Sequence, residues 1–138
     1  MAKFPAPNEG IALTHFIVSR DVERSRRFYV DVLGGEAVLE GDPSIVALAN
    51  GWITISVGGG PTEDKPNVTL EPPSDLSHAS AFLNIRVADI RAVYEQWSDR
   101  GAKFLTPPIY RGVEIRCYMR DPDGHLIEVG QLVAPLGK

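Results

Sequence analysis

The feature that most constrains the fold is an internal repeat. Asp21 and Asp89 lie about 68 residues apart, and each precedes apolar residues at helical spacing that end at a glycine, Gly34 and Gly101 respectively. An Asp in this position can cap the free N–H groups of the first helical turn, and a glycine after the last turn commonly ends the helix. The sequence therefore predicts two helices that begin near Asp21 and Asp89.

Short strand-like runs surround each of these helices. One run precedes each helix and three follow it, at 11–18, 36–40, 44–49, 52–57, 80–87, 103–105, 113–119 and 125–129. The order strand, helix, three strands thus occurs twice, with a period too long for a solenoid repeat. We predict one α+β domain over residues 1–138 made of two βαβββ modules, about 11–57 and 80–131. The intervening segment 58–79, rich in Gly, Pro, Asp and Ser, is expected to be a linker.

Composition limits the partners and the compartment. The 138 residues carry a net charge of −4, which argues against nonspecific binding to nucleic acid. No run of about 18 apolar residues is present, so no membrane partner is expected. Cys117 is the only cysteine, which excludes an intrachain disulfide and a cysteine-based zinc site. The first residues lack the apolar run of a signal peptide, and we expect a cytoplasmic protein.

Two segments at opposite ends of the chain carry a family resemblance. The run DVERSRRFY that begins at Asp21, followed by Val32-Leu33-Gly34, resembles the first-helix signature of the vicinal oxygen chelate superfamily, which includes glyoxalase I, bleomycin-resistance proteins and extradiol dioxygenases. The run RDPDGHLIE that ends at Glu128 is similar to the terminal hairpin of that family. The resemblance implies that each module forms a cup-shaped mixed sheet, that the two modules enclose a cavity, and that the chain pairs into a homodimer.

The resemblance also implies a site for one divalent metal ion such as Zn, Ni, Fe or Mn. In metal-dependent members, four side chains from the first and last strands of the two modules hold the ion. Glu128 stands where the last ligand of the family stands, and His15 is the candidate for the first. Members usually place that first ligand seven residues before the capping Asp, where this chain has Thr14. Because strand side chains alternate, this offset leaves open whether His15 faces the cavity.

The other two ligand positions depart from the pattern. Phe82 stands seven residues before Asp89 and cannot bind a metal, and Asn84, two residues later, offers only a weak carbonyl ligand. The last strand of the first module offers Thr54 and Ser56, which are unusual anchors for zinc, nickel or iron. The sequence therefore predicts an altered metal site or a metal-free pocket.

Strand alternation supplies the candidate ligand-binding residues. Arg116 and Tyr118 share one face of the run 113–120, and Glu128 shares a face with Leu126 and Gly130. We predict that Glu128 points into the cavity with Tyr118 and Arg116, and Asn84 joins them as a ligand-binding candidate.

Two functions lead at this point, and a third option is a partner domain whose pocket is vestigial. The first is an enzyme with an altered divalent-metal site, either a lyase or isomerase or a dioxygenase-like protein, in which Glu128 is a metal ligand or a catalytic base. The second is a metal-free protein that binds a small molecule, such as an antibiotic or toxin, as bleomycin-resistance proteins do. Both take a small-molecule partner.

Overall fold

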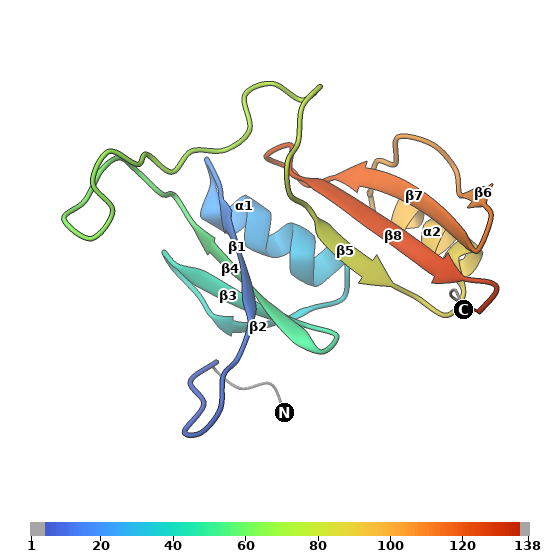
Figure 1. The fold of residues 1–138 in the computed structure, drawn as a ribbon, viewed down its shortest axis with the longest axis horizontal. Coiled ribbons are helices and arrows are strands. Elements are labelled where there is room, and N and C mark those ends of the chain that lie inside the picture. Colours follow the sequence, from blue (N-terminus) through green and yellow to red (C-terminus); the bar gives the residue numbers. More distant parts are fainter. Residues whose placement is uncertain (1–4, 136–138) are drawn as a thin grey trace. The chain divides into compact units, whose positions relative to one another are not determined.

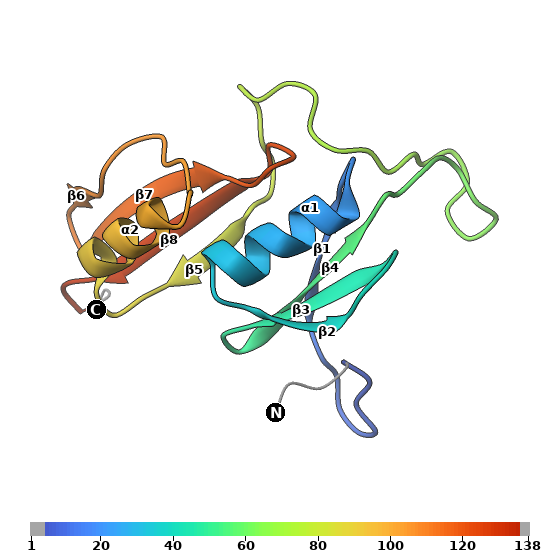
Figure 2. The ribbon, with the colours of Figure 1, turned by 180° about the vertical axis from the view of Figure 1, so that it is seen from behind.

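The computed structural model describes residues 5–135, and the chain divides into two compact units, Met1–Ser74 and Asp75–Lys138. Each unit holds a four-stranded mixed sheet with helical structure on one face (Figures 1 and 2). The order strand, helix, three strands occurs in both units, which confirms the predicted pair of βαβββ modules.

The first unit is built from residues of the N-terminal half. Its sheet has the order β1-β4-β3-β2, with β1 parallel to β4 and the other pairs antiparallel. Its elements are β1 (Thr14–Val18), α1 (Val22–Arg27), the π-helical turn η1 (Phe28–Val32), β2 (Glu36–Leu39), β3 (Ser44–Leu48) and β4 (Gly51–Ser56).

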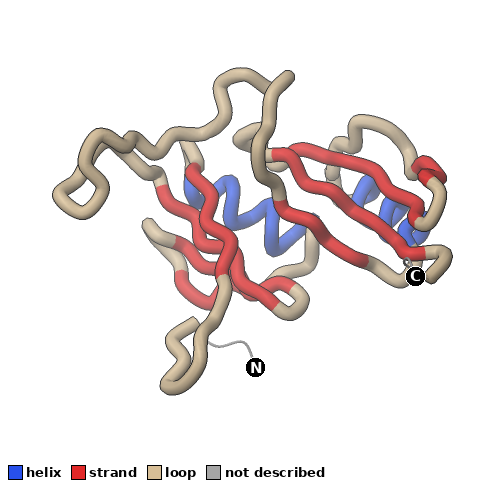
Figure 3. The backbone as a smooth tube through the Cα atoms, in the orientation of Figure 1, coloured by secondary structure: helices blue, strands red, loops and turns tan. Residues whose placement is uncertain are grey.

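The second unit repeats this topology, and Figure 3 shows its strands in red. Its sheet has the order β5-β8-β7-β6, with β5 parallel to the central strand β8. Its elements are β5 (Leu83–Arg86), α2 (Ile90–Asp99), β6 (Ile109–Arg111), β7 (Glu114–Arg120) and β8 (Leu126–Leu132).

Both helices begin at the predicted caps. The side chains of Asp21 and Asp89 accept hydrogen bonds from the backbone N–H groups of Arg24 and Ala92, each at 3.1 Å. Each bond satisfies one of the donors that a first helical turn leaves without a partner. In both units three residues separate the end of the first strand from the start of the helix, residues 19–21 and 87–89.

The core of the second unit lies between its sheet and α2. Buried side chains of the two central strands and of the helix fill this layer: Cys117, Met119, Ile127, Val129, Ile90 and Trp97. This burial raises the pKa of the Cys117 thiol to about 11, so the thiol stays protonated at neutral pH. Gln131 Oε1 accepts a 2.8 Å hydrogen bond from the Ile90 N–H, which ties the start of α2 to β8.

A tight turn joins β7 to β8, as predicted. The Gly124 N–H donates to the Asp121 carbonyl at 3.0 Å, and Gly124 has a φ of +95°, which favours glycine. The side chain of Asp121 accepts from the N–H groups of Asp123 and His125. This turn fixes the hairpin register that brings the candidate site residues together.

One predicted strand is wrong, and others are shorter than predicted. The run 103–105 forms only an isolated bridge, between Phe104 and Met119, and the edge strand β6 lies later, at Ile109–Arg111. Pro107 and Pro108 lack the N–H groups that would continue a ladder, so the strand starts after them. Strands β1 and β5 begin at Thr14 and Leu83, three residues later than expected.

The segment 58–79 contains no named strand, although two isolated bridges occur within it, Gly59 with Leu70 and Thr62 with Lys65. Within residues 5–135, no helix is both long enough and apolar enough to span a bilayer.

Candidate functional site

The face of the second sheet that is turned away from α2 carries the candidate residues. In the sheet register, Glu128 on β8 lies between Asn84 on β5 and Tyr118 on β7. Residues paired in this way project to the same side of a sheet. We call this surface the polar face and define it by Asn84, Arg86, Glu114, Arg116, Tyr118 and Glu128.

Glu128 is the buried centre of the polar face, with only 6% of its surface exposed. The Tyr118 hydroxyl donates a 2.9 Å hydrogen bond to Glu128 Oε2, and Asn84 Nδ2 donates to Glu128 Oε1. A buried carboxylate is costly unless such donors compensate it. Burial, together with the Glu128 carboxylate, raises the pKa of Tyr118 and keeps its hydroxyl protonated as a donor.

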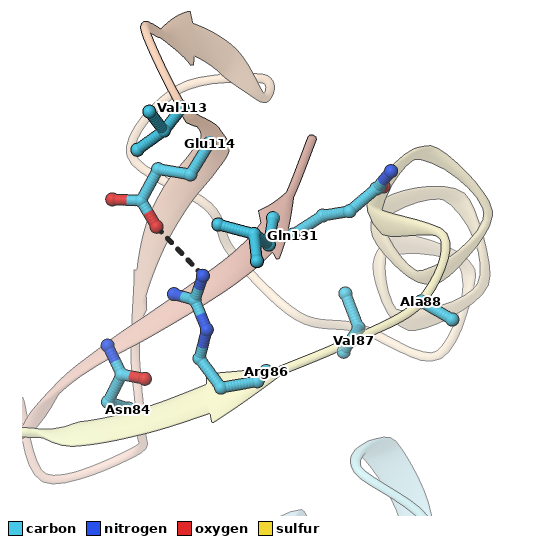
Figure 4. A pocket seen from close by; sticks show the side chains of 8 residues that line it. Asn84, Arg86, Val87, Ala88, Val113, Glu114 and Gln131 are labelled. Atoms are coloured by element: carbon cyan, nitrogen blue, oxygen red, sulfur yellow. Dashed lines mark ion pairs between the residues drawn. The ribbon is translucent and has the colours of Figure 1, made fainter. Parts of the chain in front are cut away.

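A row of alternating charges continues from Glu128 along the polar face. Arg116 Nε lies 3.9 Å from Glu128 Oε2, and Arg116 Nη1 lies 3.0 Å from Glu114 Oε2. Arg86 Nη2 pairs with the other oxygen of Glu114 at 2.9 Å, and Figure 4 shows this pair. The hydrogen bond from Arg116, followed by the contact with Arg86, lowers the pKa of Glu114, so that carboxylate stays ionised.

Four candidates from the sequence therefore meet in one cluster, namely Glu128, Tyr118, Arg116 and Asn84. Sequence reasoning missed Arg86 and Glu114. Strand alternation carried the signal for both, because Arg86 follows Asn84 by two residues and Glu114 precedes Arg116 by two.

An aromatic pair borders the carboxylate. The rings of Phe82 and Tyr118 make an edge-to-face contact with centroids 5.9 Å apart and an interplanar angle of 77°. Phe82 remains 41% exposed, so its ring offers apolar surface beside the polar groups of Glu128 and Tyr118.

His15 lies in the first unit, on the helix-covered side of its sheet. Arg26 of the helix donates to Ser44 Oγ at 3.1 Å, so Ser44 faces the helix, and Ser44 pairs with Ile55. Ile55 pairs with Ile17, and His15 stands two residues before Ile17. The register therefore puts His15 on the helix-covered side, while Thr14 projects to the opposite side. A metal-binding role for His15 stays a prediction.

Comparison with known proteins decides the family. Residues 11–129 match the model of the Glyoxalase/Bleomycin resistance protein/Dioxygenase superfamily, which covers both βαβββ modules. The chain belongs to this superfamily. Proteins of this group often bind divalent metals or small molecules.

The chain is similar to two curated proteins in sequence and to a solved structure in fold. Biphenyl-2,3-diol 1,2-dioxygenase 3 of Rhodococcus globerulus is 30% identical over 85% of this chain, but the match spans only 61% of that protein. Probable lactoylglutathione lyase of Synechocystis sp. is 26% identical over 80% of this chain and 87% of its own length. The solved structure of TnmS3, an antibiotic binding protein from Streptomyces sp. CB03234, covers 92% of this chain and 99% of its own, with a TM-score of 0.65 and 18% identity. That last likeness shows a shared fold.

The donor atoms around Glu128 do not fit a divalent metal. Both Glu128 oxygens already accept hydrogen bonds, and Asn84 turns its N–H group, not its carbonyl, toward the carboxylate. Phe82 offers no ligand atom, and the guanidinium of Arg116 would repel a cation. In the part of the chain that the structure describes, no three His, Cys, Asp or Glu side chains form a group able to hold a metal.

Proposed function

We propose that this superfamily member is a metal-independent small-molecule-binding protein whose ligand lies on the polar face at Glu128. The observation that carries the proposal is the arrangement of donors around this carboxylate, since Asn84 and Tyr118 occupy both oxygens where metal-binding members would place a cation. Glu128 is thereby compensated without an ion.

The chemistry of the polar face supports a planar ligand with polar substituents. The Phe82 ring supplies apolar stacking surface, and the Tyr118 hydroxyl oxygen can accept a hydrogen bond while donating to Glu128. Small-molecule sites commonly combine apolar walls with a few fixed polar groups in this way. Binding of an antibiotic by TnmS3 is consistent with such a role for this fold.

The test is binding of a panel of planar aromatic compounds, including naphthalene-2-carboxamide, acridine and anthraquinone, in the presence of EDTA. We expect at least one compound to bind and to shift the backbone amide NMR signals of Asn84, Tyr118 and Glu128. If every compound fails to bind in EDTA, or binds elsewhere on the chain, the proposal is wrong.

A second candidate is a lyase or isomerase step with Glu128 as the catalytic base. The 2.9 Å hydrogen bond between Tyr118 and Glu128 favours it, because this contact pairs a proton donor with a carboxylate at the edge of an aromatic surface. Formation of lactoylglutathione by the purified chain, with loss of that activity in Glu128→Gln, would favour this candidate over simple binding.

We also propose that the chain is a cytoplasmic homodimer. Both units leave large apolar side chains in solvent, with Phe16 49% exposed in the first and Leu132 47% exposed in the second, and such surfaces are commonly covered by association. Sedimentation equilibrium is expected to give twice the 15.1 kDa mass of the chain. A monomer that persists at high micromolar concentration would contradict the dimer.

A further inference from the structure

A pocket adjoins the Glu128 cluster at the end of β5. Its volume is about 670 Å³, and Asn84 belongs both to its wall and to the contacts of Glu128. Arg86 and Glu114 both line it and form the ion pair that Figure 4 shows. The remaining walls include the apolar side chains of Val87, Val113 and Leu132.

The side chains that line this pocket leave hydrogen-bond donors unused, whereas most of their acceptor atoms are already engaged. Both oxygens of Glu114 accept from guanidinium groups, one from Arg86 and one from Arg116. Gln131 Oε1 is engaged by the Ile90 N–H. Arg86, by contrast, has a side chain 46% exposed and uses Nη2 alone in its ion pair with Glu114. A guanidinium carries five N–H donors, so Arg86 can take a second acceptor.

Gly130 sets the position of this guanidinium. A Cβ atom at Gly130 would overlap Arg86 Nη1, so the missing side chain is what lets the guanidinium lie against β8. Gly130 is buried and has no left-handed φ, so backbone conformation does not require glycine there. The close approach of Arg86 is the contact that a larger residue would disturb.

We propose that this pocket binds the carboxylate of an apolar monocarboxylate. The ligand carboxylate pairs with the remaining donors of Arg86, and its apolar body rests on Val113 and Leu132, which are 41% and 47% exposed. Paired N–H donors of arginine match the geometry of a carboxylate. This inference rests on the proposed small-molecule function and names the ligand class for the same polar face.

The test compares two probes of nearly the same shape by calorimetric titration in EDTA, the charged naphthalene-2-carboxylate and the neutral naphthalene-2-carboxamide. We expect the acid to bind wild-type protein about tenfold more tightly than the amide, because only the carboxylate offers two charged oxygens that can form an ion pair with Arg86. In Arg86→Gln this preference should disappear, because the acid loses its ion pair and therefore loses more affinity than the amide does. Glu114 keeps Arg116 as its partner in that variant.

Two further variants separate the position of the Arg86 guanidinium from the overall charge of the protein. Gly130→Ala keeps every charge but displaces the guanidinium, so it should also weaken binding of the acid. Lys103→Gln removes one positive charge at an exposed residue outside the pocket, and it should leave the preference intact. Chemical unfolding of each variant checks that it is folded.

The outcomes separate this inference from the proposed function. Equal affinities of acid and amide, or a preference that survives in Arg86→Gln, would overturn the carboxylate site while leaving a small-molecule site at Glu128. Failure of the acid to bind while other panel compounds bind would overturn it too. Failure of the whole panel would overturn the proposed function itself.

Discussion

Replacing Ile127 by alanine is expected to lower the free energy of unfolding by about 2–5 kcal/mol, since a fully buried aliphatic side chain is lost and a cavity remains. Ile127 is 0% exposed and lies on the central strand β8, on the side that packs against α2. Urea unfolding measures the effect.

Leu132→Ala is the matched control on the same strand. Leu132 is 47% exposed, so its truncation should lower the free energy of unfolding by much less than the truncation of Ile127 does. Equal losses in the two variants would contradict the assignment of the two faces of β8, and with it the placement of Glu128 on the polar face.

Replacing Glu128 by glutamine is expected to reduce the affinity for a bound panel compound by about tenfold or more and to lower the free energy of unfolding by about 1–3 kcal/mol. Glutamine keeps the shape but supplies one acceptor oxygen and one NH2 group, which only donates. That donor must face either the Tyr118 hydroxyl or the Asn84 amide, both of which donate to the native carboxylate. Arg116 also loses one of its two carboxylate partners.

Glu95→Gln is the control for this variant, because Glu95 lies exposed on α2, which covers the other side of the sheet. Calorimetric titration and urea unfolding should find it close to wild type. A Glu128→Gln protein that binds the compound as tightly as wild type would show that the ligand does not depend on the cluster.

The architecture could be predicted from the sequence because local signals agreed with one another. Asp21 and Asp89 fixed the helix starts, and the Pro122-Asp123-Gly124 turn fixed the last hairpin. A strand was predicted at 103–105 because this run has the composition of a strand. The two prolines that follow it exclude a continuous ladder, and the edge strand begins only at Ile109.

Strand alternation predicts which candidate residues share a face of one strand, but it does not predict which residues of different strands are in contact. Alternation along β7 puts Tyr118 and Arg116 on the same face of that strand. Alternation along β8 puts Glu128 on the same face as Leu126 and Gly130. The turn fixes the register of β7 with β8 and so pairs Tyr118 with Glu128. No local signal fixes the register of β5 with β8, which brings Asn84 to Glu128. The Arg86–Glu114 pair joins two strands that are not neighbours in the sheet, and for that reason it stayed hidden.

The affinity of a panel compound measured with EDTA and again with added Zn²⁺, Ni²⁺ or Mn²⁺ tests the central claim most directly. Because hydrogen bonds from Asn84 and Tyr118 already compensate Glu128, we expect the same dissociation constant under all conditions and no calorimetric signal from the metals alone. Binding that EDTA abolishes and one equivalent of metal restores, with loss of that metal in Glu128→Gln, would contradict a metal-independent site.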